Sequence, residues 1–272
     1  MELLTISALG IAVVSAFRGT WSPCGVSMLS SITPLSEKTR GNRYWATVTW
    51  FIFGAILGGA TLGALAALGA LVVSATGISP TASAAAVLVA ALITVASDLG
   101  VGGYRLPANP RQVERTWLDR YRSWIYGVGF GWQLGVGVAT YVMSSSIYLM
   151  VVTAVATGEP VLAMTIVTLF GFLRGLAVLP AFRVSTPADL TALHRRIERF
   201  RPLSRALAVI AQIGVLATAA TVLGGVVAGL VVAAVFLVVT WMLHDGLEDP
   251  APRQRRQPLA ATGLQPLSNP PS

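Results

Sequence analysis

The sequence is poor in charged residues. Asp, Glu, Lys and Arg together make up 11% of the 272 residues, whereas hydrophobic types make up 54%. Soluble domains carry roughly 25% charged residues, so this composition cannot cover a water-exposed surface. The sequence instead contains several apolar runs long enough to cross a bilayer, which needs about 20 residues. A soluble globule is therefore excluded, and we predict an all-α integral membrane protein surrounded by lipid.

Cysteine and histidine are also scarce. The chain has one cysteine, Cys24, and two histidines, His194 and His244. A disulfide needs two sulfurs, so none can form within the chain. Neither histidine has a second ligand at metal-binding spacing. The sequence also lacks a Gly-Lys-Ser/Thr phosphate loop and a Gly-x-Ser-x-Gly elbow. We therefore predict no metal and no other cofactor, and we favour a role other than that of an enzyme.

The net charge of +8 reflects topology rather than nucleic-acid binding. Of the 19 basic residues, 17 lie in four groups between or after apolar runs. Cytoplasmic loops of membrane proteins are enriched in Lys and Arg, and no nucleic-acid-binding module accompanies these groups. We therefore predict no nucleic-acid partner. The groups are Lys38, Arg40 and Arg43; Arg105, Arg111, Arg115, Arg120 and Arg122; Arg183, Arg195, Arg196, Arg199, Arg201 and Arg205; and Arg253, Arg255 and Arg256.

Seven apolar runs fit this charge pattern. With the N-terminus outside, seven spans put all four basic groups inside and make the C-terminus cytoplasmic. Six spans, with one long and bent last helix, are the alternative. The Ala-, Val- and Gly-rich, lysine-poor composition indicates a bacterium, so we predict the bacterial inner (plasma) membrane. The runs are Leu3 to Leu35, Trp45 to Ser74, Ser83 to Gly102, Ser123 to Ala156, Val161 to Phe182, Ala206 to Val222 and Val226 to Leu243.

The first and fourth runs predict an inverted repeat. Each has about 33 residues and would form a helix about 50 Å long, too long for a hydrocarbon core of about 30 Å. Each run must therefore break, with Pro23 and Gly25 as break residues in the first and Gly131, Trp132 and Gly135 in the fourth. Broken helices at matching positions of two oppositely oriented halves are typical of transporters. We divide the chain into a first three-helix half (1–102), a basic loop (103–122), a second three-helix half (123–222), a seventh helix (223–243) and a disordered tail (244–272).

One motif resembles a known family. Phe17 to Pro34 reads Phe-Arg-Gly-Thr-Trp-Ser-Pro-Cys-Gly-Val-Ser-Met-Leu-Ser-Ser-Ile-Thr-Pro. This stretch resembles the first helix of the DsbD/CcdA-like thiol–disulfide and cytochrome c biogenesis carriers. In that family a Gly-rich lead into Trp-Thr-Pro-Cys opens the second half. Here Gly127 to Gly135 keeps the lead and the Trp, but Leu134 and Gly135 replace the Pro and Cys.

The resemblance implies a thiol–redox carrier that works with a second protein. The family's disulfide joins two helix cysteines, so this chain would need a thioredoxin-like or other thiol partner to supply the second thiol. Cys24 would then be the working thiol, whereas the alternative is a small buried hydrophobe. Two other functions stay open: a small-solute carrier of the same architecture, and a non-catalytic membrane scaffold. The oligomeric state is not predicted.

Four polar residues stand inside apolar runs. Buried ionisable residues in membranes pair with one another or line a polar path. Arg18, Asp98 and Arg174 fall at similar depths if their spans start at the outer face. We therefore expect Asp98 to pair with one or both arginines in a polar cavity; the alternative is that the arginines reach the interface. Gln133 and the Ser144-Ser145-Ser146 run could coordinate a solute or hydrogen-bond neighbouring helices.

Overall fold

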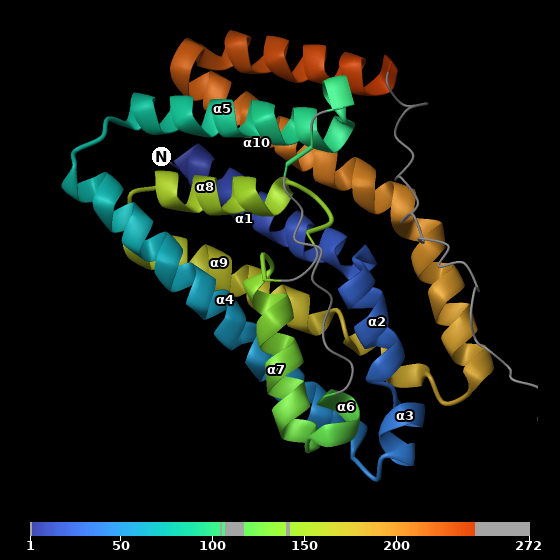
Figure 1. The fold of residues 1–272 in the computed structure, drawn as a ribbon. Coiled ribbons are helices and arrows are strands. Elements are labelled where there is room, and N and C mark those ends of the chain that lie inside the picture. Colours follow the sequence, from blue (N-terminus) through green and yellow to red (C-terminus); the bar gives the residue numbers. More distant parts are fainter. Residues whose placement is uncertain (1, 104, 107–116, 140–141, 243–272) are drawn as a thin grey trace, which may run out of the picture.

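The computed structural model describes residues 2–103, 105–106, 117–139 and 142–242, and every regular element in these ranges is a helix. Figure 1 shows their arrangement. The α-helices are α1 (Glu2–Arg18), α2 (Pro23–Ser31), α3 (Pro34–Thr39), α4 (Tyr44–Ala75), α5 (Pro80–Leu99), α6 (Trp117–Arg120), α7 (Ser123–Val136), α8 (Ser146–Ala156), α9 (Pro160–Leu176) and α10 (Pro187–Met242), and the 3-10 turns are η1 (Gly19–Trp21), η2 (Val101–Gly103) and η3 (Leu179–Arg183).

The helices confirm the predicted all-α membrane class. Within the described ranges, five segments are long and apolar enough to cross a bilayer. Large apolar side chains such as Leu65, Val161 and Val227 are more than 60% exposed along these segments. Surfaces of this kind are stable against lipid and unfavourable against water. The chain is therefore a multi-span membrane protein.

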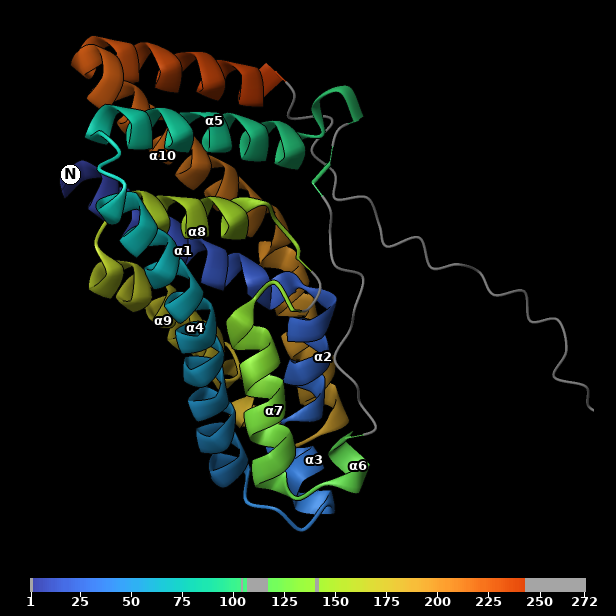
Figure 2. The same cartoon turned by 60° about the vertical axis from the view of Figure 1, so that its left-hand side comes forward.

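The first and fourth apolar runs are both split into two helices, α1–α2 and α7–α8. α1 packs beside α8 in the largest apolar cluster, and α2 packs beside α7 in a second cluster. The two broken helices therefore lie antiparallel, which Figures 1 and 2 both show. An inverted repeat would have this arrangement, and the repeat with its division into two halves stays a prediction.

Glycines let α4 pack closely against α7 and α9. A Cβ atom on Gly54 or Gly58 would overlap backbone atoms of α7, and one on Gly59 would meet the backbone of α9. Small residues at such spacing allow two membrane helices to approach at backbone distance. These glycines are packing residues, and they fix the second half of the chain against the first.

The long helix α10 contains a reversal at Gly225. This residue has non-helical angles, φ 80° and ψ 176°, and a positive φ is readily adopted only by glycine. Residues 226–242 then fold back, because Gly229 lies against Ala217 and Thr221, and Figures 1 and 2 show this arm near α5. The reversal falls where we expected the sixth and seventh spans to separate, and the number of spans stays a prediction.

The basic segments gather at one end of the bundle. Figure 1 shows α3, α6 and the connection from α9 to α10 at this end, while the α4–α5 and α8–α9 connections lie at the other. The predicted topology assigns the basic end to the cytoplasm, and that orientation stays a prediction. Most of the basic loop around Arg111 and Arg115 and the tail 244–272, predicted to be disordered, lie outside the described residues.

Candidate functional site

The first helix break lies between Arg18 and Pro23. Ser22 is extended, and Pro23 is the first residue of α2, where its missing N–H costs nothing. The Ser22 hydroxyl caps α2 by accepting a hydrogen bond of 3.1 Å from the Gly25 N–H. A Cβ on Gly25 would overlap the carbonyl oxygens of Thr20 and Gly19. Pro23 and Gly25 therefore both belong to the break.

The second break lies later in the chain than we predicted. α7 is helical through Val136, and the chain leaves the helix at Gly137, whose φ is 72°. The next helix begins at Ser146. The three predicted break residues of the fourth run lie inside α7, and this assignment was wrong: Gly131, Trp132 and Gly135.

Contacts with α4 explain why those three residues stay helical. A Cβ on Gly131 or Gly135 would overlap the backbone of α4, so both glycines serve helix packing. The Trp132 indole N–H donates to Thr61 Oγ1 of α4 at 3.1 Å. Gln133 is half-buried in the same helix and does not line the cavity described below.

Arg174 of α9 joins the two breaks. Its Nε donates to the carbonyl oxygen of Leu134 at 3.2 Å, and its Nη2 makes a long 3.5 Å contact with Ser22 Oγ. The Leu134 carbonyl belongs to the last turn of α7, where the helix dipole attracts a cation, and it also accepts from the Gly137 N–H at 3.1 Å. The guanidinium also occupies the space that a side chain on Gly19 would need. Arg174, only 4% exposed, thus contacts both broken helices.

Arg18 ends α1 beside the same junction. It is 3% exposed, and its Nη1 donates to Ser204 Oγ of α10 at 2.9 Å. The neighbouring Trp21 donates its indole N–H to the Ile197 carbonyl at 2.7 Å. These contacts hold α10 against the first break. Both arginines are therefore buried inside the bundle, and their depth in the membrane stays a prediction.

The two breaks enclose a small polar cavity. Its volume is about 20 Å³, which is room for roughly one water molecule. Ser15 lies in its wall, 5% exposed, and its hydroxyl has no hydrogen-bond partner among the described residues. The lining residues come from α1, both breaks, α8 and α9: Ser15, Arg18, Gly19, Gly137, Val142, Met143, Ser144, Ser146, Ile147, Phe170 and Arg174.

Asp98 does not pair with either arginine, contrary to our expectation. Its carboxylate accepts from Ser144 Oγ at 2.5 Å, from the Ser145 N–H at 2.8 Å and from Gln212 Nε2 at 2.7 Å. Arg205 donates to its backbone carbonyl at 3.2 Å. Three donors satisfy the charge in place of a salt bridge, and Asp98 anchors the second break to α5 and α10.

Cys24 lies in the first turn of α2 and is 1% exposed. It borders a second cavity of about 10 Å³ together with Ser27, Met28, Ser31, Leu118, Phe130 and Leu134. Arg174 interacts electrostatically with it. The thiol therefore lies at the first break, beside the residue that joins both breaks, but covered by apolar side chains. Its reactivity stays a prediction.

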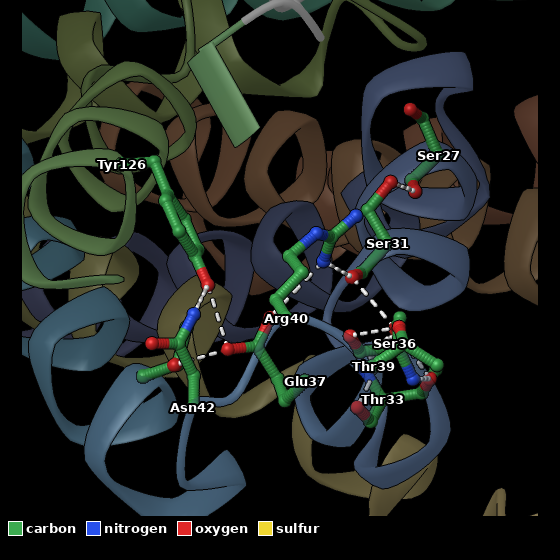
Figure 3. A network of polar contacts seen from close by, with 10 residues as sticks. Ser27, Ser31, Thr33, Ser36, Glu37, Thr39, Arg40, Asn42 and Tyr126 are labelled. Atoms are coloured by element: carbon green, nitrogen blue, oxygen red, sulfur yellow. Dashed lines mark hydrogen bonds and ion pairs between the residues drawn. The ribbon is translucent and has the colours of Figure 1, made fainter. Parts of the chain in front are cut away.

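A polar network at the basic end, drawn in Figure 3, was not predicted from the sequence. Glu37 is fully buried. Its carboxylate accepts from Thr47 Oγ1 and Tyr126 OH, each at 2.6 Å, and pairs with Arg40 at 3.2 Å. Asn42 donates to the same Tyr126 oxygen at 3.1 Å. The only available signal was the single acidic residue within the first basic group.

The chain is similar to several bacterial proteins named methylamine utilization protein MauF. It is 32% identical to that of Paracoccus denitrificans over 188 residues, covering 64% of this chain and 65% of the relative. For Paracoccus versutus the identity is 28%, covering 64% and 67%, and for Methylobacillus flagellatus it is 31%, covering 62% and 60%. No family model matches, and no solved structure matches.

The match spans 65%, 67% and 60% of the length of these three relatives, which is less than two thirds for the first and the third. None of the three names is that of a thiol–disulfide or cytochrome c biogenesis carrier, so the resemblance to the DsbD/CcdA-like group stays a prediction. The bacterial relatives and the apolar helices together support a bacterial membrane protein. The chain is thus a multi-span helical membrane protein that is similar to MauF proteins over part of its length.

Proposed function

We propose that this protein is a small-solute carrier that works by alternating access around the junction of its two broken helices. The observation that carries this proposal is the polar cavity enclosed by both breaks, with two buried arginines in its wall. Buried charges in a membrane are costly and mark substrate pathways. Carriers with inverted repeats bind their solutes where discontinuous helices meet.

The network around Glu37 supports the same mechanism. It links α3 and α4 of the first half to α7 of the second half at the basic end. Alternating access requires contacts that close one end while the other is open. We propose that this network closes the basic end in the described conformation, and that it separates when the cavity opens toward that end.

The relatives' name suggests the process that the carrier serves. Those proteins are named for methylamine utilization. We propose that this protein likewise supports the bacterial use of small nitrogen or carbon compounds. A carrier would move a solute that such a process consumes or releases.

Alternating access can be tested without knowing the solute. Replacing Cys24 with serine removes the one native thiol, and Ser15→Cys or Met143→Cys then places a single thiol in the cavity wall. We expect a membrane-impermeant maleimide to label each thiol from the external side in intact cells. The same reagent should label it from the cytoplasmic side in inverted vesicles, whose cytoplasmic face is turned outward. Labelling from a single side would contradict the carrier mechanism.

Two exposed positions give matched controls for this experiment. Thr39 is the last residue of α3 at the basic end, and Ser74 lies near the end of α4, so Thr39→Cys and Ser74→Cys place thiols at opposite ends. Each should be labelled from one side only, and the two sides should be opposite. Their labelling also decides the orientation of the protein, because the predicted topology puts Thr39 in the cytoplasm.

A thiol–redox role is the second candidate, favoured by the position of Cys24 at the capped start of α2 beside Arg174. Helix N-termini and nearby cations activate thiols. The Cys24 thiolate would attack a partner's disulfide, forming one mixed disulfide and releasing the partner's other sulfur as a thiolate. Trapping a disulfide-linked complex that Cys24→Ser abolishes would support this role. Labelling of Cys24 only after denaturation would contradict it.

A further inference from the structure

We infer that the cavity between the two broken helices binds one small monovalent anion, of the size of chloride, nitrate or formate. This inference rests on the proposed carrier function and names the class of its solute. The anion could also bind to this cavity without being transported, so binding and transport need separate experiments.

The charges around the cavity carry the inference. The described residues that line it include two guanidinium groups and no carboxylate. Asp98 hydrogen-bonds the wall residue Ser144 but does not itself line the cavity, and its carboxylate already accepts from three donors. Among the described residues, Arg174 contacts neutral oxygens, those of Leu134 and Ser22. A buried guanidinium is stabilised far more by an anion than by neutral acceptors.

Hydrogen-bond donors face the same space. The Arg174 guanidinium lies against Gly19, which is part of the cavity wall. The Ser15 hydroxyl, 5% exposed, has no partner among the described residues. A buried hydroxyl without a partner is unfavourable, and an anion in the cavity would accept its proton. The Ser144 proton, by contrast, is directed to Asp98.

The cavity volume limits the ligand. About 20 Å³ corresponds to roughly one water-sized position, so the described conformation can enclose a halide or a planar anion of a few atoms after small shifts of the wall. A dicarboxylate or a phosphate ester is too large. Two arginines would also repel methylammonium, so we do not expect this cation as the ligand, although the relatives are named for methylamine utilization.

Formate binding to the purified full-length chain in nanodiscs is the direct test. The unfolding temperature would be followed by tryptophan fluorescence while sodium formate replaces sodium gluconate at constant ionic strength. A ligand that binds only the folded state raises this temperature in a saturable way. We expect such a rise for the wild type with formate, nitrate and chloride. No rise with any of these three anions would overturn the inference.

Three variants separate the cavity from general salt effects. Arg174→Gln should weaken binding more than about tenfold, because it removes a charge-assisted donor. Ser15→Ala should weaken it by roughly two- to tenfold while keeping both charges. Arg199→Gln removes an exposed arginine near the start of α10 that does not line the cavity, and it should leave binding unchanged. Equal anion responses in all four proteins would contradict a site in this cavity.

The labelling experiment distinguishes failure of this inference from failure of the carrier proposal. Formate binding that depends on Arg174, with Ser15→Cys labelled from one side only, would support the anion site and overturn alternating access. Labelling of Ser15→Cys from both sides without any anion response would support alternating access and overturn the anion site. If Arg174→Gln does not fold, the Ser15→Ala and Arg199→Gln pair still decides the anion site.

Discussion

Gly19 leaves open the space that the guanidinium of Arg174 occupies. One residue belongs to the first helix break and the other to α9, 155 positions further along the chain. The contact lets a single cation reach both the Ser22 cap of α2 and the Leu134 carbonyl of α7. The absence of a side chain at Gly19 is therefore as necessary to the junction as the charge of Arg174.

Gly19→Ala should displace Arg174 and loosen the junction. We expect it to lower the free energy of unfolding by about 1–3 kcal/mol, the usual cost of overpacking a close-packed site, and to weaken anion binding in parallel. Gly10→Ala is the matched control, because a Cβ there meets no atom within 4 Å. Thermal unfolding in nanodiscs, with and without formate, would measure the stability and the anion binding of each variant. Equal stability of Gly19→Ala and Gly10→Ala would contradict the close contact.

Asp98 should couple energetically to Gln212 and not to Arg18. Asp98→Asn weakens three hydrogen bonds, including that from Gln212, and buried hydrogen bonds to charged groups contribute about 1.5–3 kcal/mol each. In a double-mutant cycle of unfolding free energies, Asp98→Asn with Gln212→Leu should give a coupling of about 0.5–3 kcal/mol. The cycle with Arg18→Gln should be additive within about 0.5 kcal/mol. Coupling of Asp98 to Arg18 but not to Gln212 would instead support the Asp98–arginine pair that we expected from the sequence.

Tyr126→Phe should weaken the network that closes the basic end. Buried Glu37 would lose one of its donors, so we expect a loss of about 1.5–3 kcal/mol in unfolding free energy. Tyr121→Phe is the control, because Tyr121 is 47% exposed and contacts Trp117 through its ring. In the labelling experiment, Tyr126→Phe should also increase access to the cavity from the basic end. Identical behaviour of the two variants would show that the network does not close this end.

The sequence predicted the features that depend on local chemistry. Apolar runs identified the membrane class, Pro23 with Gly25 marked the first break, and Gly225 marked a reversal within the last apolar stretch. These signals are readable because proline and positive-φ glycine act on the backbone where they stand.

The features that depend on packing partners could not be predicted in this way. Glycines in α7 look like a helix break, but the backbone of α4 takes the space beside them, so the true break comes at Gly137. Asp98 and Arg174 fall at similar depths in their spans, yet they point to different neighbours. Depth along a span does not determine which face of a helix a side chain occupies, and a single sequence contains no information on distant contacts such as Glu37 with Tyr126.

Gly58 should be intolerant of any side chain. A Cβ at this position would overlap the Trp132 carbonyl and approach the backbone of Val136, so α4 and α7 would have to separate. Gly58→Ala should therefore cost about 1–3 kcal/mol, although alanine is the better helix former by about 1 kcal/mol. Gly214→Ala in α10, where a Cβ meets no atom within 4 Å, should be neutral or stabilising. Because α7 ends directly at the second break, Gly58→Ala should also weaken formate binding, and normal binding in a destabilised variant would show that the cavity does not depend on the α4–α7 distance.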